Sequence, residues 1–385
     1  MPQNKSSDYM LDVAAGHKYR NQTEEYSERY HEWRTDPSNR YGYNYVHDTR
    51  IRTYVDGEGY VEDTPAETEK KALMNCYRLT ATTLLLMSVV AAVRYIVMWL
   101  AFDLPGGGRS YYSDIGSSER ISDGAAYALL LLNILEYLLP IFFLKAFTRM
   151  PSKIAVPLKK SRISALSSIM MMLVIMCIGK LFNSLCSYLF SFAKMDIPYY
   201  DYILAGNTST ALICGLGQHV LLAVLIEILF RGYMLQLFRQ FGDTFAVVAT
   251  SFASCFMLYD LTQMMYIFCV GIFTGIITIR SGSIKNACIM RVIARFVNYI
   301  LTFSTFVIGT HGSHIVQIVF CLIIFSGAIF VYMRINTRRR WSFDTSSAGS
   351  YLTMGEKLRM VTGSVSFWGW AVLSFVLSIL MVRIL

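Results

Sequence analysis

The sequence predicts an all-α, polytopic integral membrane protein, a helical bundle of about nine transmembrane helices preceded by a disordered N-terminal tail. Hydrophobic residues make up 54% of the 385 residues and charged residues only 16%, against about 45–50% and about 25% in soluble domains. The mean hydropathy is +0.42. Apolar stretches of about 20 residues, the length that crosses a bilayer, recur along the chain.

The formal charge of +9 is distributed unevenly along the chain. Residues 1–74 carry 10 Lys and Arg against 14 Asp and Glu, whereas the rest of the chain carries 25 against 12. The basic excess lies in loops beside apolar stretches, where it determines orientation in the membrane. We therefore expect the lipid bilayer as a partner and no nucleic acid.

Residues 1–74 form the first predicted domain, a polar, Tyr-rich cytoplasmic tail. The first 70 residues hold 9 tyrosines and many charged residues but few aliphatic ones. Such a segment buries too little apolar surface to offset its ordering entropy, which favours disorder. The alternation within RYGYNYVHDTRIRTYVDGEGYVE leaves paired strands as an alternative for that part.

Residues 75–385 form the second predicted domain, the transmembrane bundle. Its apolar stretches predict spans separated by polar loops, with a polar connector at 335–364 before the last one. In order, the spans cover residues 77–102, 125–147, 164–193, 210–238, 244–260, 264–280, 284–309, 314–333 and 366–384.

The loops predict the orientation of these spans. The loop at 148–162 carries five basic residues and no acidic one, so we place it in the cytoplasm. Alternation from there places the loops at 103–124, 194–208, 261–263 and 310–313 outside, and these hold few basic residues. We therefore predict a multi-pass protein of the cell membrane with its N-terminus in the cytoplasm and its C-terminus outside.

Ionisable side chains inside the predicted spans are candidate functional residues, because a charge at membrane depth is costly. Arg94, Glu136 and Lys180 are each isolated in their span, and we interpret them as charges that snorkel or pair across helices. The other such residues lie between residues 219 and 295. They are His219, Glu227, Arg231, Asp260, Arg291 and Arg295.

Two of these residues, Glu227 and Arg231, are four positions apart on one predicted helix face. That spacing and the cost of an unpaired charge favour a mutual salt bridge. His219 lies two turns before Glu227 on a similar face, although a hydrogen-bonded core histidine is the alternative. The eight cysteines form no CxxC pair and nearly all fall in apolar spans, so we expect buried thiols and no metal site.

Three segments carry motifs: IEILFRGYMLQ at 226–236, SFASCFMLYD at 251–260 and GIFTGIITIRSGSIKNACIMRVIAR at 271–295. Together they resemble the signature of the CPBP family (CAAX proteases and bacteriocin-processing enzymes, also called Abi). That signature has two adjacent glutamates before an Arg-Gly, then a Phe followed four residues later by a His. A Gly-rich helix, a Thr/Ser-Gly-Ser turn and a helix carrying His and Asn complete it. The resemblance covers residues 75–385, with the motif region at 219–298.

The resemblance implies a CAAX-protease-like core, in which the glutamates and histidines of family members activate a water, with a bound metal often proposed. In this sequence Glu227 and Arg231 match the second glutamate and the arginine. The other positions differ: Ile226 replaces the first glutamate, Asp260 the first His, Arg291 the second His and Arg295 the Asn.

These replacements change the chemistry that the site can perform. An alkyl side chain at Ile226 offers no proton acceptor, and a guanidinium has no lone pair for a metal and repels cations. We therefore predict that Glu227, Arg231, Asp260, Arg291 and Arg295 form a buried ion-pair network, with His219 nearby. A straight fifth span would carry Asp260 about 24 Å from its start, whereas Arg291 would lie about 12 Å past the Ser281–Ser283 turn. The two meet only if the helices join deep in the membrane or tilt.

The prediction for function is a catalytically degenerate intramembrane protease homologue that acts by binding a membrane protein or peptide and needs no cofactor. The alternative is an active intramembrane endopeptidase that processes membrane, prenylated or bacteriocin-type peptides through Glu227. Arg231 and Asp260 would be its catalytic partners, with His219 as the alternative to Asp260, and zinc or another divalent metal would be bound. A third interpretation is a small-solute carrier or channel with the charged cluster as its polar path. The inverted repeat typical of many carriers is not evident in the sequence.

Overall fold

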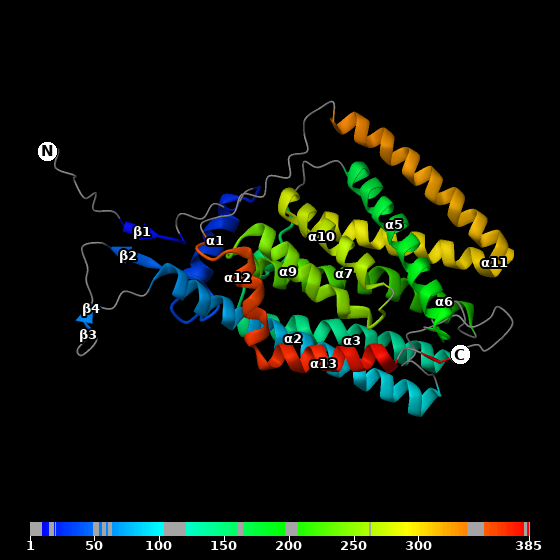
Figure 1. Ribbon diagram of the computed structural model, residues 1–385, viewed down its shortest axis with the longest axis horizontal. Coiled ribbons are helices and arrows are strands. Elements are labelled where there is room, and N and C mark those ends of the chain that lie inside the picture. The colour runs from blue at the N-terminus through cyan, green and yellow to red at the C-terminus, as the bar shows by residue number, and fades with distance from the viewer. Residues whose placement is uncertain are drawn as a thin grey trace.

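The computed structural model is built from helices, with a few very short strands (Figure 1). It describes residues 10–14, 19, 21–48, 54–55, 59–60, 64–103, 121–159, 165–196, 207–261, 263–336, 350–380 and 383–384. The helices are α1 (Glu24–Thr35), α2 (Pro65–Phe102), α3 (Asp123–Thr148), α4 (Ser152–Ala155), α5 (Ala165–Phe192), α6 (Thr208–Leu216), η3 (Gly217–Leu221), α7 (Leu222–Glu227), η4 (Ile228–Met234), α8 (Leu235–Arg239), α9 (Asp243–Cys255), η5 (Phe256–Leu258), α10 (Met264–Ser281), α11 (Ile284–Asn336), α12 (Met354–Arg359), η6 (Met360–Gly363) and α13 (Val365–Leu380).

The strands of the described residues form three antiparallel pairs. These are β1 (Met10–Asp12) with β2 (Val46–Asp48), β3 (Tyr54–Val55) with β4 (Gly59–Tyr60), and β5 (Met195–Asp196) with β6 (Arg383–Ile384). Paired strands were the alternative prediction for the alternating segment of the tail, and β2, β3 and β4 confirm it there.

The helices form layers around the middle of the chain (Figure 1). α2 packs against both α3 and α13 on one side. α7, α9 and α10 lie in the middle, and α5 and α11 pack together on the other side. The helices of the motif region are therefore covered from two directions by other helices.

Four helical segments among the described residues are long and apolar enough to cross a membrane: α2, α3, the segment Thr208–Arg239 and α10. The bent pair of α12–η6 and α13, with an angle of 79° between its halves, makes five if it counts as one span. The chain is thus a multi-pass helical membrane protein, but the prediction of nine spans is not confirmed. Hydropathy marked 244–260 as a span because it is apolar, yet α9 has only 13 residues and packs inside the bundle.

The predicted break between the seventh and eighth spans is not an interruption of the helix, although the helix reverses its direction. Residues 310–313 are part of α11, which is helical without interruption over 53 residues. Figure 1 shows its second half turning away from the first and running back beside α5. A helix satisfies its backbone groups internally, so a short polar stretch does not have to end it.

The prediction of a disordered tail is wrong for residues 21–48. α1 begins at an N-cap, Thr23, whose hydroxyl accepts a hydrogen bond from the Tyr26 amide. Tyr26, Tyr30 and Trp33 are buried in the same hydrophobic cluster as the membrane helices. The low content of aliphatic residues predicted disorder, but in this segment aromatic side chains supply the apolar surface that is buried.

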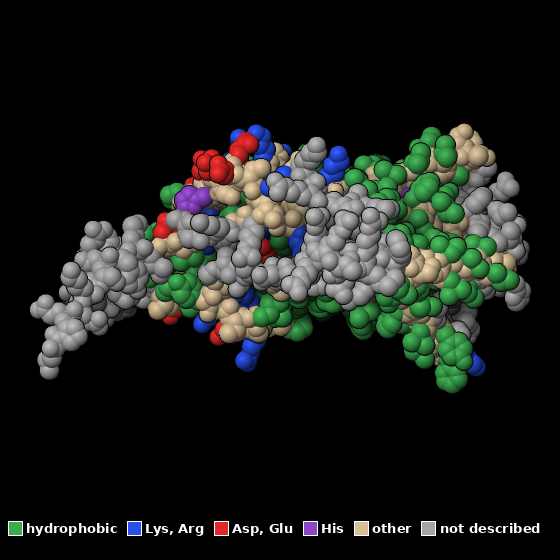
Figure 2. Space-filling model, turned by 90° about the horizontal axis from the view of Figure 1, so that it is seen from above, with side chains coloured by type: hydrophobic (Ala, Val, Ile, Leu, Met, Phe, Trp, Pro, Cys, Tyr) green, Lys and Arg blue, Asp and Glu red, His purple; other side chains and the backbone are tan. Residues whose placement is uncertain are grey.

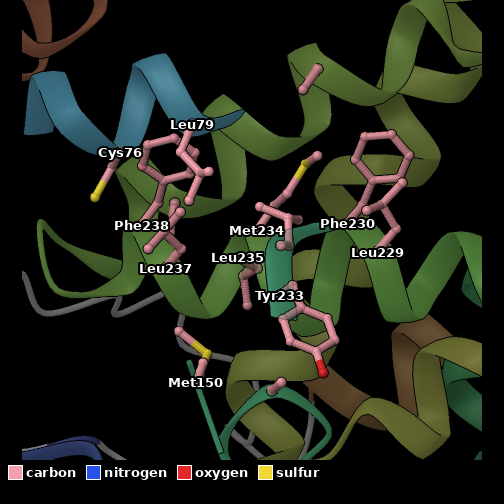
Figure 3. Packing of buried hydrophobic residues seen from close by; sticks show 14 of the residues in the cluster. Cys76, Leu79, Met150, Leu229, Phe230, Tyr233, Met234, Leu235, Leu237 and Phe238 are labelled. Carbon is pink, nitrogen blue, oxygen red and sulfur yellow. The ribbon is translucent and has the colours of Figure 1, made fainter. Parts of the chain in front are cut away.

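The main hydrophobic core surrounds the end of the segment Thr208–Arg239. Figure 3 shows Cys76 and Leu79 of α2 beside Leu237 and Phe238 of α8. All eight cysteines are free; Cys76, Cys177, Cys214 and Cys255 are buried, as predicted, whereas the other four are half-buried. Charged side chains gather at the end of the molecule near α1, whereas hydrophobic side chains cover much of the opposite end (Figure 2).

A buried ion pair joins the two long helices α2 and α3. Arg94 Nε donates to Glu136 Oε2 over 3.2 Å, and the side chains are 1% and 0% exposed. Of the two predicted alternatives, snorkelling and pairing across helices, the structure shows pairing for both charges. The side chain of Lys180, the third isolated charge, lies outside the described part of the chain.

We expect Arg94→Leu to lower the free energy of unfolding by about 3–5 kcal/mol, because it leaves the Glu136 carboxylate buried without its counter-charge. The double variant Arg94→Leu, Glu136→Leu removes both charges and is expected to recover most of that loss. Thermal unfolding in detergent measures both. A single variant as stable as the wild type would contradict the pairing.

The packed tyrosines of the N-terminal segment predict sensitivity to alkaline pH. Burial raises the pKa of Tyr19 to about 12, against the opposing charges of Arg34 and Arg239. Burial also raises the pKa values of Tyr26 and Tyr30. Because the packed phenols hold their protons more tightly than free ones, packing is fully stable below about pH 10 and weakens as the pH rises toward about 12. Phenolate absorbance during a pH titration in detergent is expected to appear late; a normal tyrosine titration would contradict the packing.

Candidate functional site

The residues Thr208–Arg239 form one continuous apolar helix, called the motif helix below. Asn207 begins it, with a side chain that accepts a hydrogen bond from the Ser209 amide over 3.0 Å. Two wider π-helical turns, η3 and η4, interrupt the α-helix on either side of α7. Such turns are rare and recur at functional sites, because each one shifts the side chains that follow it.

Glu227, the last residue of α7, is fully buried and faces two guanidinium groups. Arg291 Nε donates to Glu227 Oε1. Arg231 Nε lies 3.9 Å from Glu227 Oε2, which makes an ion pair and not a hydrogen bond. The salt bridge predicted from the i,i+4 spacing of Glu227 and Arg231 is therefore present, and Arg291 adds a second cation to it.

Arg231 is held mainly by hydroxyl groups. Its Nε donates to Thr274 Oγ1 over 3.0 Å and its Nη1 to Thr250 Oγ1 over 2.6 Å. Thr250 in turn donates to the Ala246 carbonyl over 2.8 Å, so its oxygen lone pairs remain available to Arg231. Threonines on α9 and α10 thus fix the guanidinium from two sides, and Arg231 is 0% exposed.

Gly271 allows α10 to approach this guanidinium. A Cβ atom at Gly271 would lie 2.8 Å from Arg231 Nη2 and 3.0 Å from Ser251 Cβ. One turn further, a Cβ at Gly275 would lie 3.1 Å from Val247 Cγ1. Two glycines four residues apart therefore bring α10 close to α9, the packing role that small residues have between membrane helices.

The Ser-Gly-Ser turn between α10 and α11 places Arg291. Gly282 has a φ of 64°, a left-handed conformation that glycine adopts without strain. The hydroxyl of Ser281 accepts a hydrogen bond from the Ser283 amide over 3.2 Å, and the Ile284 amide donates to the Pro157 carbonyl over 3.0 Å. This turn starts α11 in the direction that carries Arg291, two turns later, to Glu227.

Arg295 and His219 lie near the first π-helical turn. Arg295 Nη1 donates to the Gln218 carbonyl over 2.9 Å. The His219 ring lies 4.6 Å from the Tyr299 ring, and its Nε2 has no hydrogen-bond partner among the described residues. Both side chains contact the interface of the motif helix and α11, about two turns from Glu227.

Asp260 lies in the turn between η5 and α10, directly after Tyr259, which has a φ of 52°. The Asp260 carboxylate accepts a hydrogen bond from Gln263 Nε2 over 2.7 Å. The structure therefore brings together Glu227, Arg231 and Arg291, and the link from Asp260 to this group stays a prediction.

The residues around Glu227 do not fit a zinc site. One carboxylate faces two guanidinium groups, which have no lone pair to give a metal. The two positive charges outweigh the single negative charge, so the site would repel a metal cation. The described residues include no group of three or more His, Cys, Asp or Glu side chains placed to hold a metal. Ile226, where the family has its first glutamate, is 0% exposed and lies in the hydrophobic core.

Sequence reasoning missed the hydroxyl groups of Thr250 and Thr274. A lone threonine in an apolar helix gives no signal of its own. A buried arginine needs several acceptors, however, and small polar residues on the neighbouring helices are the only local candidates in a membrane core. The buried polar residues near the end of the motif helix, Gln236 and Gln240, were missed in the same way.

Long apolar helices around a buried charged centre define the class of a multi-pass helical membrane protein. Within that class, residues 208–297 match the family model described as Type II CAAX prenyl endopeptidase Rce1-like. The match includes the motif helix, α9, α10 and the start of α11, and it confirms the resemblance to the CPBP, or CAAX protease, family. No curated protein matches the chain. No solved structure matches it either.

We expect Gly271→Ala to lower the free energy of unfolding by about 1–3 kcal/mol, because the added methyl group would displace Arg231 or separate α10 from α9. Gly124→Ala is the matched control, since the built Cβ there meets only the Phe102 ring at 3.8 Å. The control is expected to be neutral or slightly stabilising, as alanine favours a helix over glycine. Thermal midpoints in detergent distinguish them, and equal midpoints would contradict the close approach.

Proposed function

We propose that the chain is a membrane protein of the CAAX protease family in which an ion pair takes the place of the hydrolytic centre. The observation that carries the proposal is the Arg291 guanidinium on Glu227 Oε1. In the family pattern Arg291 stands where a histidine belongs, so a fixed positive charge lies against the carboxylate. Glu227, Arg231, Asp260, Arg291 and Arg295 would then stabilise the site electrostatically, with no metal and no other cofactor.

The function that fits such a site is binding without hydrolysis. A general base needs a free oxygen that faces its substrate, but the Arg291 guanidinium occupies one oxygen of Glu227 and Arg231 lies beside the other. We propose that the chain binds a membrane protein or a peptide within the bilayer. Its composition gives no reason to expect nucleic acid as a partner.

The proposed orientation has the N-terminus in the cytoplasm and the C-terminus outside, in the cell membrane. Two contacts support it. The N-terminal segment packs against the basic loop at 148–162, through Lys153 and Glu25 for example. Strand β6, near the C-terminus, pairs with β5 in a loop that the basic residues predict to lie outside.

An active intramembrane endopeptidase remains the second candidate. The observation that favours it is Glu227 Oε2, which is buried and has no hydrogen-bond partner among the described residues. That oxygen is able to accept a proton from a nucleophile if Arg231 moves away. Arg231 and Asp260 would then assist, and a divalent metal such as zinc would enter only with a rearrangement of Arg291.

The test is to incubate the purified full chain in lipid with prenylated peptides, bacteriocin-type leader peptides and other membrane peptides. Mass spectrometry follows cleavage, and metal analysis of the same sample follows zinc. We expect no cleavage above the level of a Glu227→Gln variant, and well below one zinc per chain, because Arg291 occupies the carboxylate.

A known active family member in the same lipid serves as the positive control for the peptides. Cleavage by the wild type that is lost in Glu227→Gln would overturn the non-hydrolytic proposal and establish the second candidate. Zinc bound near one ion per chain, lost in the same variant, would overturn the proposal that the site needs no metal.

A further inference from the structure

The N-terminal segment 21–48, called the strap below, is hydrogen-bonded to the end of the motif helix. Tyr26 Oη donates to Gln236 Oε1 and Tyr30 Oη donates to the Gln236 carbonyl, each over 2.6 Å. The Tyr43 amide donates to Gln240 Oε1 and Gln240 Nε2 donates to the Tyr41 carbonyl, each over 2.7 Å. The polar groups of Gln236 and Gln240 are thus satisfied largely by a segment about 200 residues away in the chain.

We propose that the strap is a positioning element for the charged site, and that Tyr26 and Gln236 are the residues through which it acts. Gln236 contacts both sides: its Oε1 accepts from Tyr26, and its Nε2 donates to the Arg231 carbonyl over 3.5 Å. Arg231 in turn faces Glu227. Three consecutive contacts therefore join the strap to the ion pair.

This connection runs through η4, the second π-helical turn of the motif helix. In a π-helical turn the hydrogen bonds span five residues, and such turns are rare inside α-helices and recur at functional sites. The Gln236 side chain supplies a further donor to the Arg231 carbonyl within that turn. If Gln236 lost Tyr26, its Oε1 would be buried without a donor, which favours a different rotamer and frees the Arg231 backbone.

The outer contacts of the strap are of a kind that can open. Lys153 pairs with Glu25 over 3.0 Å, but both side chains are more than half exposed. Lys159 donates to the Asn21 carbonyl over 2.9 Å, also at an exposed position. Exposed ion pairs are weak and screened by salt, so the rim of the strap is loose while its tyrosines are held firmly.

The strap therefore gives a cytoplasmic partner a physical route to the buried site. A protein that bound α1 and withdrew Tyr26 and Tyr30 would remove both hydrogen bonds to Gln236 and alter how Arg231 meets Glu227. This inference goes beyond the proposed function, since it holds whether or not Glu227 hydrolyses a peptide.

A double-mutant cycle tests the coupling in the full chain in detergent. Tyr26→Phe removes one hydroxyl and keeps the ring, and Glu227→Gln removes the carboxylate charge. If the strap positions Arg231, the two changes are not independent, and the thermal midpoint of the double variant is expected to differ by about 2 °C or more from the sum of the single shifts.

Tyr43→Phe is the matched control. It is the same chemical change, in the same strap and at a fully buried position, but the Tyr43 hydroxyl donates to the Pro65 carbonyl of α2. We expect its effect to add to that of Glu227→Gln. Coupling with Tyr26 and additivity with Tyr43 would support the proposal, because general loosening of the strap would affect both pairs alike.

Trypsin gives a second measurement, since Arg40 of the strap is exposed and Arg29 of α1 is partly exposed. Cleavage at these residues is expected to be slow in the wild type and several-fold faster in Tyr26→Phe, Tyr30→Phe. Faster cleavage with additive midpoints would mean that the strap binds without positioning the site, which overturns the proposal. Unchanged cleavage would overturn it too, because the tyrosines would then not hold the strap.

Discussion

The meeting of Glu227 with two guanidinium groups is the constraint on which the motif region depends. Three charges are buried there, and each would be costly in a helix interior without partners. The partners have to come from three different helices, so α9, α10 and α11 must approach the motif helix closely. Gly271, Thr250 and Thr274 make this approach possible, since they are small or carry a hydroxyl where bulkier residues would block it.

Much of the helical fold follows from hydropathy, because long apolar stretches have few alternatives to a helix in a bilayer. The second and sixth predicted spans coincide with α3 and α10 to within two residues, and the first lies within the longer α2. Hydropathy cannot distinguish a stretch that crosses a membrane from one that is buried within a bundle, and α9 is of the second kind. It also cannot show that a polar stretch such as 310–313 remains helical.

The candidate site was partly accessible from sequence. The spacing of Glu227 and Arg231 gives their ion pair directly, and the motif places Arg291 in register with them. The threonines that hold Arg231 depend on which helices are neighbours, and no local pattern encodes that. The strap was not predicted for a related reason. Its composition is typical of disorder, and its tyrosines are held by glutamines on a helix about 200 residues later in the chain.

Hydrogen bonds through Gln236 connect the ion pair of the site to the strap. A hydrolytic centre with a metal has to keep lone pairs pointing at one place, whereas a carboxylate paired with arginines needs only that the charges stay close. Such a pair tolerates small displacements, but its strength depends on the backbone that carries Arg231. That backbone lies in a π-helical turn, where Gln236 donates to the buried Arg231 carbonyl, and Gln236 in turn accepts a hydrogen bond from Tyr26. The strap thereby contacts, through Gln236, the backbone that carries a buried charge, and its aromatic residues supply buried apolar surface in a segment that is otherwise polar.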